Sequence, residues 1–203
     1  MTICDLFQFK ESAVYPEMDV VFAMNANSGD ADVIFTLITD TVRKIMSDFG
    51  FGNGNIQYGA IVYGATIGTT LQLGDPSFKR IEDLRDYIQK LSKQTSDPQI
   101  DKALREALKI FQGPNARPGA KQVLIVLTDK KSTSSEEVIK TSARLLEDKN
   151  IRVIPVSVGS DADPDELRSI TPYKGDLIKA KKDEEPWRLA REIIIKILTG
   201  MVF

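Results

Sequence analysis

Two apolar runs along the chain have the pattern of strands that are buried on both faces. Residues 20–24 and 123–127 are apolar without interruption and are bounded by polar residues. A strand in a parallel sheet is covered by helices on both sides, so it is apolar at every position and not only at every second one. We therefore predict two central strands, over residues 19–24 and 122–128. A similar apolar segment, residues 151–158, predicts another strand.

A hairpin is predicted in the first half of the chain. Residues 56–63 and 66–73 are rich in β-branched and aromatic side chains, which favour strands. Only Gly64 and Ala65 separate the two segments, and such a short connection joins antiparallel strands. We expect residues 66–73 to form an antiparallel strand at the edge of the sheet. Residues 177–180 predict a further, weak strand.

Amphipathic helices are predicted between these strands, because apolar residues recur there at steps of three and four. The expected helices cover residues 31–49, 81–91, 100–111, 134–147, a short segment from 163, and 187–198. Ser134 and Glu137 have the spacing of a capping box at the start of one helix. Asp163 followed by Pro164 predicts an N-cap and a first helical residue.

The alternation of strands and helices predicts the fold class and the domain organisation. We expect an α/β fold with a doubly wound, mostly parallel six-stranded sheet, one antiparallel edge strand and helices on both faces. The length of 203 residues suits a single core. We assign residues 18–199 to one domain, residues 1–17 to an N-terminal extension and residues 200–203 to a C-terminal tail.

Charge and composition narrow the classes of function. The chain has 27 Lys plus Arg against 29 Asp plus Glu, so it has no general attraction to nucleic acid or to an anionic membrane. Its longest apolar runs are about five residues, far short of a bilayer span, so no membrane insertion is expected. The chain has no histidine, which removes the Ser-His-Asp and Cys-His nucleophilic systems and the commonest zinc ligands. We therefore expect no enzymatic activity.

Four passages resemble the von Willebrand factor A domain family, and they occur in that family's order and spacing. They are residues 19–25, 57–63, 121–129 and 151–159, and the resemblance extends over roughly residues 18–199. It implies the strand order 3-2-1-4-5-6. It also implies that ligands bind above the carboxyl ends of the central strands, where the strand order reverses.

The resemblance also implies a metal ion-dependent adhesion site, which in the family holds Mg²⁺ or Mn²⁺ with an Asp-x-Ser-x-Ser loop, a distant threonine and a distant aspartate. In this chain Asn25 replaces the loop aspartate, Asn27 the first serine and Gly29 the second. The threonine position falls on Pro98, and only Asp129 remains as in the family. Two amide oxygens and one carboxylate are a thin shell for Mg²⁺, which prefers octahedral oxygen coordination.

We therefore expect no metal cofactor. The alternative is weak binding of Mg²⁺ or Mn²⁺ by Asp129 together with Asn25 and Asn27. Without a metal, Asn25 and Asn27 are expected to brace the loop after the first strand, and Asp129 to accept hydrogen bonds from backbone N–H groups. Asp97 is expected to be an N-cap, with Pro98 as the first residue of a helix.

Taken together, the resemblance implies a non-enzymatic protein–protein interaction module like those of extracellular matrix and adhesion proteins, with a protein partner that includes matrix proteins as candidates. A secreted location follows from the resemblance, while a cytoplasmic or nuclear scaffold remains the alternative. The one cysteine, Cys4, can form no internal disulfide and could link two copies of the chain. An enzyme of the same fold would need a nucleophile with a base, a metal-bound water or a cofactor loop, and none is evident.

Overall fold

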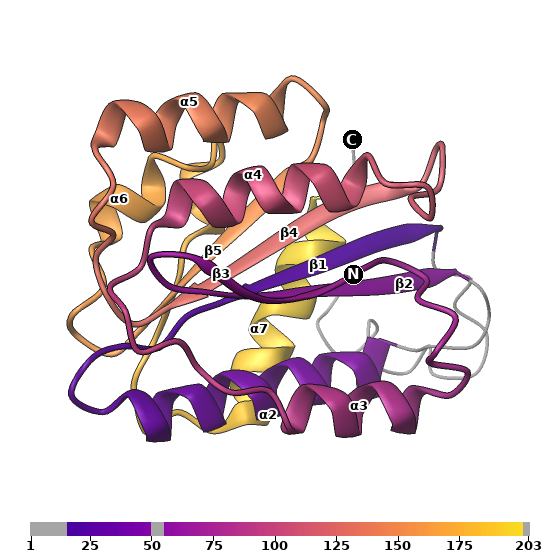
Figure 1. Cartoon of the computed structure of the whole chain (residues 1–203), viewed down its shortest axis with the longest axis horizontal. Helices are drawn as coiled ribbons and strands as arrows, with labels where there is room; N and C mark the ends of the chain where they lie inside the picture. The colour runs from indigo at the N-terminus through magenta and orange to yellow at the C-terminus, as the bar shows by residue number, and fades with distance from the viewer. Residues whose placement is uncertain (1–15, 50–54, 201–203) are drawn as a thin grey trace.

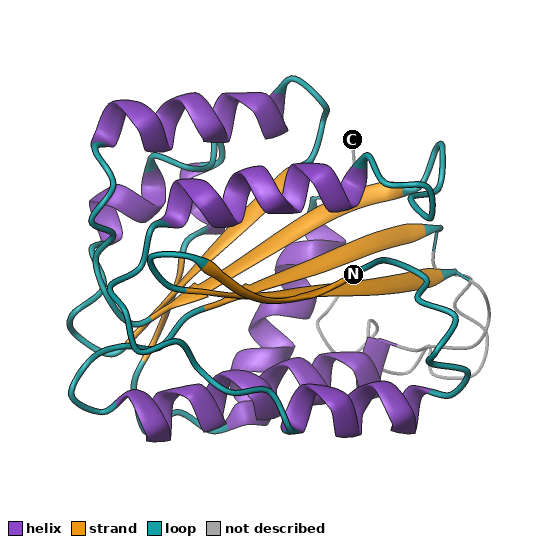
Figure 2. Cartoon of the chain, in the orientation of Figure 1, coloured by secondary structure: helices purple, strands orange, loops and turns teal. Residues whose placement is uncertain are grey.

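The structure, a computed structural model, describes residues 16–49 and 55–200. These residues form a sheet of six strands in the order β3-β2-β1-β4-β5-β6, with helices on both faces (Figure 1, Figure 2). The strands are β1 Met18–Met24, β2 Ile56–Tyr63, β3 Ile67–Leu71, β4 Lys121–Thr128, β5 Arg152–Val158 and β6 Ile178–Ala180. The predicted fold class and strand order are confirmed.

The two strands predicted to be central lie side by side. β1 and β4 are parallel, and Phe22 is opposite Ile125. β3 pairs with β2 in the antiparallel direction, as predicted, although three residues, 64–66, connect the two strands and not the two expected. It is shorter than expected, because the chain turns away from the edge after Leu71 and reaches Gly74, whose φ is 56°. An edge strand has a neighbour on one side only, so its pairing ends where the chain bends away.

Six helices and a short 3-10 helix cover the sheet within the described residues. They are α2 Ala31–Phe49, α3 Ile81–Gln89, α4 Ile100–Phe111, α5 Glu136–Glu147, α6 Pro164–Arg168, α7 Pro186–Thr199 and the 3-10 helix η1 Lys174–Asp176. Figure 1 shows α2, α3 and α7 on one face and α4, α5 and α6 on the other. None of these helices is both long enough and apolar enough to cross a bilayer.

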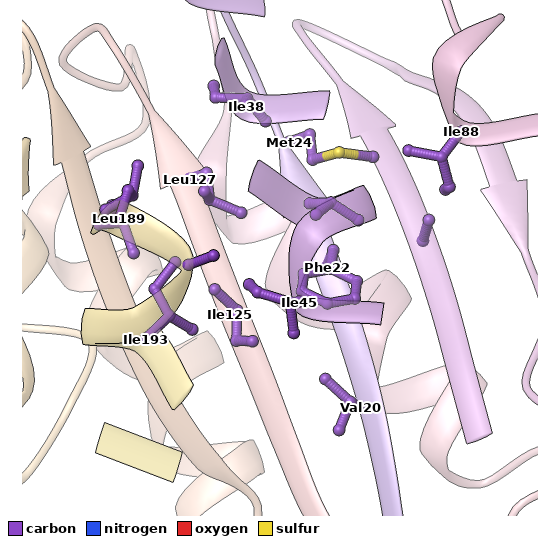
Figure 3. Packing of buried hydrophobic residues seen from close by; sticks show 14 of the residues in the cluster. Val20, Phe22, Met24, Ile38, Ile45, Ile88, Ile125, Leu127, Leu189 and Ile193 are labelled. Atoms are coloured by element: carbon purple, nitrogen blue, oxygen red, sulfur yellow. The ribbon is translucent and has the colours of Figure 1, made fainter. Parts of the chain in front are cut away.

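The larger part of the core lies between the sheet and the layer of α2, α3 and α7. Figure 3 shows Phe22 and Ile125 of the sheet with Ile45 of α2 and Ile193 of α7. All four side chains are buried, and the Phe22 ring stacks on that of Tyr58 with centroids 6.0 Å apart. Burial from both faces explains why β1 and β4 are apolar at nearly every position.

Of the helix starts predicted at Ser134 and at Asp163, the second is confirmed and the first is wrong. The Asp163 side chain accepts hydrogen bonds from the backbone of Asp165 and Glu166, and Pro164 begins α6. α5 has Ser135 and not Ser134 as its N-cap residue, without a side-chain cap. The Ser134 hydroxyl instead donates to the carboxylate of Asp101 on α4, because a buried carboxylate needs a donor more than an exposed helix end does.

The ends of the chain carry predictions that the structure does not address. Residues 1–15 and 201–203 lie outside the described residues, and with them Cys4 and most of the predicted extension and tail. The described part begins close to the sheet, where the Lys121 backbone N–H donates to the carbonyl of Glu17 at 2.8 Å.

Candidate functional site

The predicted site residues meet at the carboxyl edge of the sheet, on the left in Figure 1, where β1 and β4 end beside each other. Three loops converge there: residues 25–30 after β1, residues 90–99 between α3 and α4, and residues 129–135 after β4. We call this surface the carboxyl edge. Because the three loops are far apart in sequence, only the doubly wound topology brings them together.

Asp129 is fully buried and is held by the backbone of the β1–α2 loop. Its Oδ1 accepts a hydrogen bond from the Asn27 N–H at 2.8 Å, and its Oδ2 accepts one from the Ser28 N–H at 3.0 Å. These two bonds agree with the expectation that Asp129 accepts hydrogen bonds from backbone N–H groups. Each carboxylate oxygen therefore already has a strong partner within the protein.

Asn25 is also fully buried and joins the ends of three strands. Its Nδ2 donates to the carbonyl of Tyr63, the last residue of β2, at 2.8 Å. Its Oδ1 accepts a long hydrogen bond, 3.4 Å, from the hydroxyl of Thr128 at the end of β4. This arrangement needs the amide, because a carboxylate at the same position has no N–H for the Tyr63 carbonyl.

Asp97 does not cap a helix, and that prediction is wrong. α4 begins at Ile100, and Gln99 is its N-cap residue. The Asp97 Oδ1 accepts hydrogen bonds from the Asn27 Nδ2 at 3.1 Å and from the Lys130 Nζ at 2.6 Å. The lysine offers a full charge, which attracts the carboxylate more strongly than a helix N-terminus does.

Pro98 lies before α4 and not in its first turn, so its predicted place at the first helical position is also wrong. It is buried, and its carbonyl accepts a hydrogen bond from the Thr133 N–H at 2.9 Å. Gly29 is exposed at the turn that leads into α2, with open space beside it. Neither residue has a side-chain oxygen. Within residues 16–49 and 55–200, no group of three or more Asp, Glu, His or Cys side chains is arranged to hold a metal ion.

Lys130 is the site residue that sequence reasoning missed. The hydrogen bond that Lys130 donates to Asp97 raises the pKa of Lys130 above its ordinary value, and the carboxylates of Asp129 and Asp161 raise it further. The ammonium is therefore charged at physiological pH. One signal was available, since Lys130 directly follows Asp129 in the sequence. Its pairing with Asp97, 33 residues away, could not be seen without the fold.

Two further titratable groups, Glu166 and Tyr63, lie next to the carboxyl edge. Glu166 of α6 is half-buried and accepts a hydrogen bond from the Ser132 N–H at 3.0 Å. Burial raises the pKa of Glu166 above its ordinary value, and the carboxylate of Asp163 adds to this. Burial likewise raises the pKa of Tyr63, so its hydroxyl stays protonated.

A comparison with family models identifies the family to which this arrangement belongs. The model described as the von Willebrand factor type A domain matches residues 19–186. The chain belongs to this family. The match covers the strands, apart from the first residue of β1, and the site residues named above, so the resemblance drawn from the four passages is confirmed.

The VWA domain is similar in sequence to parts of extracellular matrix proteins. It is 24% identical over 186 residues to the human (Homo sapiens) collagen alpha-6(VI) chain, covering 90% of this chain and 8% of the collagen chain. It is 25% identical over 154 residues to bovine (Bos taurus) matrilin-1, covering 75% of this chain and 27% of the matrilin. The chain thus spans only a small part of the length of these relatives.

Solved structures with the same fold include metal-containing ones. Proximal thread matrix protein 1 from the mussel byssus, in a form with a zinc-occupied MIDAS motif, gives a TM-score of 0.79 at 20% identity, covering 90% of this chain and 48% of that one. The manganese-loaded TRAP protein of Plasmodium vivax gives a TM-score of 0.69 at 16% identity, covering 87% and 73%. At these identities the likeness establishes the VWA fold and no more.

Proposed function

We propose that this VWA domain is a protein–protein interaction module of an extracellular assembly and that it binds its partner at the carboxyl edge without a divalent metal ion. The similarity to parts of matrix proteins supports the matrix setting and the extracellular location. The proposed partner is a matrix protein.

The observation that carries the metal-free mode is the small number of side-chain oxygens left to coordinate an ion at the carboxyl edge. A divalent ion at this edge would need carboxylate and hydroxyl oxygens that are free to coordinate it. Both oxygens of Asp129 accept backbone hydrogen bonds, and Gly29 and Pro98 contribute no side-chain oxygen. The residues at this edge therefore do not fit Mg²⁺ or Mn²⁺, and we assign no step of binding to a metal.

We further propose that the domain catalyses no reaction. The Lys130 ammonium is paired with the Asp97 carboxylate and stays charged, so Lys130 is a poor base or nucleophile. The half-buried Glu166 is engaged by a backbone N–H, and the sequence contains no histidine that could act with it. The polar groups of the edge are suited to forming hydrogen bonds with a partner.

Binding to purified matrix proteins, measured by biolayer interferometry with and without EDTA, tests the metal-free mode. We expect at least one of a panel that includes fibrillar collagen, fibronectin and laminin to bind, and its affinity to be the same in EDTA and in Mn²⁺. Loss of that binding in EDTA, or failure of every panel member to bind, contradicts the proposal.

Two arginine substitutions test the location of the binding surface. Gly29 at the carboxyl edge and Gly175 in η1, near the opposite edge, both have open space where a side chain would extend. Gly29→Arg should therefore abolish binding while Gly175→Arg leaves it intact, since both proteins can fold. Equal effects of the two substitutions would place the surface elsewhere.

A variant with the family's loop provides the positive control for metal binding. Asn25→Asp, Asn27→Ser and Gly29→Ser together supply one charge and two hydroxyl ligands. We expect this triple variant to release heat on titration with Mn²⁺ in a calorimeter, and the wild-type domain to release none.

A further inference from the structure

Lys130 lies where the three loops of the carboxyl edge meet. Its ammonium donates to the Oδ1 of Asp97 at 2.6 Å, and the same oxygen accepts a hydrogen bond from the side chain of Asn27 at 3.1 Å. The backbone N–H of Asn27 donates in turn to Asp129 at 2.8 Å. An unbroken chain of contacts therefore runs from Lys130 through Asp97 and Asn27 to Asp129, and it joins all three loops.

The charges at this point require a cation. Asp97 and Asp129 both accept hydrogen bonds from Asn27, Asp97 from its side chain and Asp129 from its backbone. Two carboxylates therefore lie next to the β1–α2 loop. Asp129 is fully buried and Asp97 is exposed, so water screens their repulsion in part, but without a positive charge nearby this repulsion weakens the contacts between the loops. The ammonium supplies that charge, and both carboxylates act on it.

The backbone of Lys130 is anchored where its side chain begins. Its carbonyl accepts a hydrogen bond from the Thr128 hydroxyl at 3.1 Å, and that hydroxyl also lies 3.4 Å from the Oδ1 of Asn25. The next residue, Lys131, has the same charge but turns away from the cluster and pairs with Asp163 at 2.8 Å. The position of the ammonium is thus particular to Lys130 and is not shared by the neighbouring lysine.

We propose that the ammonium of Lys130 is the resident cation of the carboxyl edge and holds the three loops together in place of a divalent ion. This inference deepens the function proposed above, because it names the group that makes a metal unnecessary. Lys130 is thereby a positioning residue for the binding surface. A covalently attached cation cannot be removed by a chelator, so the loops keep their positive charge in EDTA.

The test compares Lys130→Met with Lys131→Met, a matched loss of one charge on the same loop. Lys130 has a side chain that is 37% exposed and Lys131 one that is 65% exposed, so neither change should prevent folding. Hydrogen exchange of the Asn27 and Ser28 amides, which hold Asp129, should become at least about tenfold faster in Lys130→Met only. Lys130→Arg keeps the charge and should stay close to the wild type.

The outcomes distinguish this inference from the proposed function. If Lys130→Met exchanges like Lys131→Met, or if Lys130→Arg exchanges as fast as Lys130→Met, Lys130 is not the resident cation. If the wild type itself binds Mn²⁺ through Asp129, the metal-free mode fails as well. If no matrix protein binds while the Lys130→Met results are as expected, only the proposed partner class is overturned.

Discussion

Arg117 and Asp19 form an ion pair at the amino end of β1, the end opposite the candidate site. The Arg117 Nε and Nη2 donate to the Oδ1 of Asp19 at 2.9 and 2.8 Å, and the Arg117 backbone N–H donates to its Oδ2 at 2.9 Å. The Asp19 side chain is fully buried and that of Arg117 is 18% exposed. Arg117 also donates to the carbonyl of Asn55, so one side chain ties together the approaches to β1 and β2.

Removing the guanidinium should destabilise the fold strongly. Arg117→Met leaves the buried carboxylate of Asp19 without its main partner, a change that typically costs about 3–5 kcal/mol in the free energy of unfolding. Urea denaturation followed by circular dichroism measures this loss. Arg80→Met is the control, since Arg80 forms a similar pair with Asp83 at the surface, and its unfolding midpoint should stay where it is. If the two substitutions lowered the free energy of unfolding equally, burial of the Asp19 carboxylate would not explain the loss.

Phe22 should be among the most sensitive positions in the core. It is fully buried between the sheet and its helical layer, so Phe22→Ala should cost about 3–5 kcal/mol through the cavity that it leaves. Val33→Ala, on a side chain that is 60% exposed, should change the stability by less than about 0.5 kcal/mol. Urea unfolding of both variants provides the comparison, and a loss below about 1 kcal/mol at Phe22 would argue against its central placement.

Gly64 should not accept a side chain, because the loop before α4 packs against it. A Cβ at Gly64 would lie 2.5 Å from the Ser96 hydroxyl and 3.0 Å from the Ser96 carbonyl, which belongs to the backbone. Gly64→Ala should therefore force the loop outward and cost about 1–3 kcal/mol. Gly175→Ala, where nothing lies within 4 Å, is the control. Thermal unfolding that is identical for the two variants would show that the loop yields freely.

The stability contributed by Glu166 should depend on pH. Because burial raises its pKa above the ordinary value of 4.5, the folded protein binds this proton more tightly than the unfolded chain does. The stabilisation is complete below pH 4.5 and is lost as the pH rises through the folded-state value. Glu166→Gln removes this titration, so the variant should gain stability relative to the wild type as the pH rises above 4.5. Urea unfolding at a series of pH values measures the difference.

The stability contributed by Asp163 should depend on pH in the opposite direction to that contributed by Glu166. The hydrogen bond from Lys131 lowers the pKa of Asp163 below its ordinary value of 3.8, so its ionised form favours the folded state. Its stabilisation is present above pH 3.8 and is lost as the pH falls through the folded-state value. Asp163→Asn, which still can cap α6, should therefore differ from the wild type least in acid. If both variants changed in the same direction with pH, one of the two assignments would be wrong.

The sequence alone was sufficient for most of the fold. The apolar runs at residues 20–24 and 123–127 predicted two strands buried on both faces, because only a strand covered by helices on both sides needs no polar positions. The three- and four-residue steps predicted the long helices. The short connection between the predicted strands 56–63 and 66–73 predicted the antiparallel pairing of β2 and β3. These patterns are local, and the order of the strands followed from the resemblance to a family.

The candidate site could be predicted only in part. The sequence determined which oxygens are missing at Asn25, Asn27, Gly29 and Pro98, since the identity of a residue decides its chemistry. It could not determine where Asp97 points. A local rule made that residue a helix cap, whereas its carboxylate turns toward the Lys130 ammonium, which only the folded topology brings near.

Competition between partners is the physical reason for this division. A helix N-terminus offers a carboxylate a partial charge, while an ammonium at hydrogen-bonding distance offers a full one, so the stronger partner prevails wherever the fold supplies it. Ser134 shows the same preference, since its hydroxyl donates to the buried carboxylate of Asp101 and does not cap α5. The sequence determined the elements and their chemical groups, and the tertiary structure decided which polar groups meet, because those pairs lie some 30 to 100 residues apart along the chain.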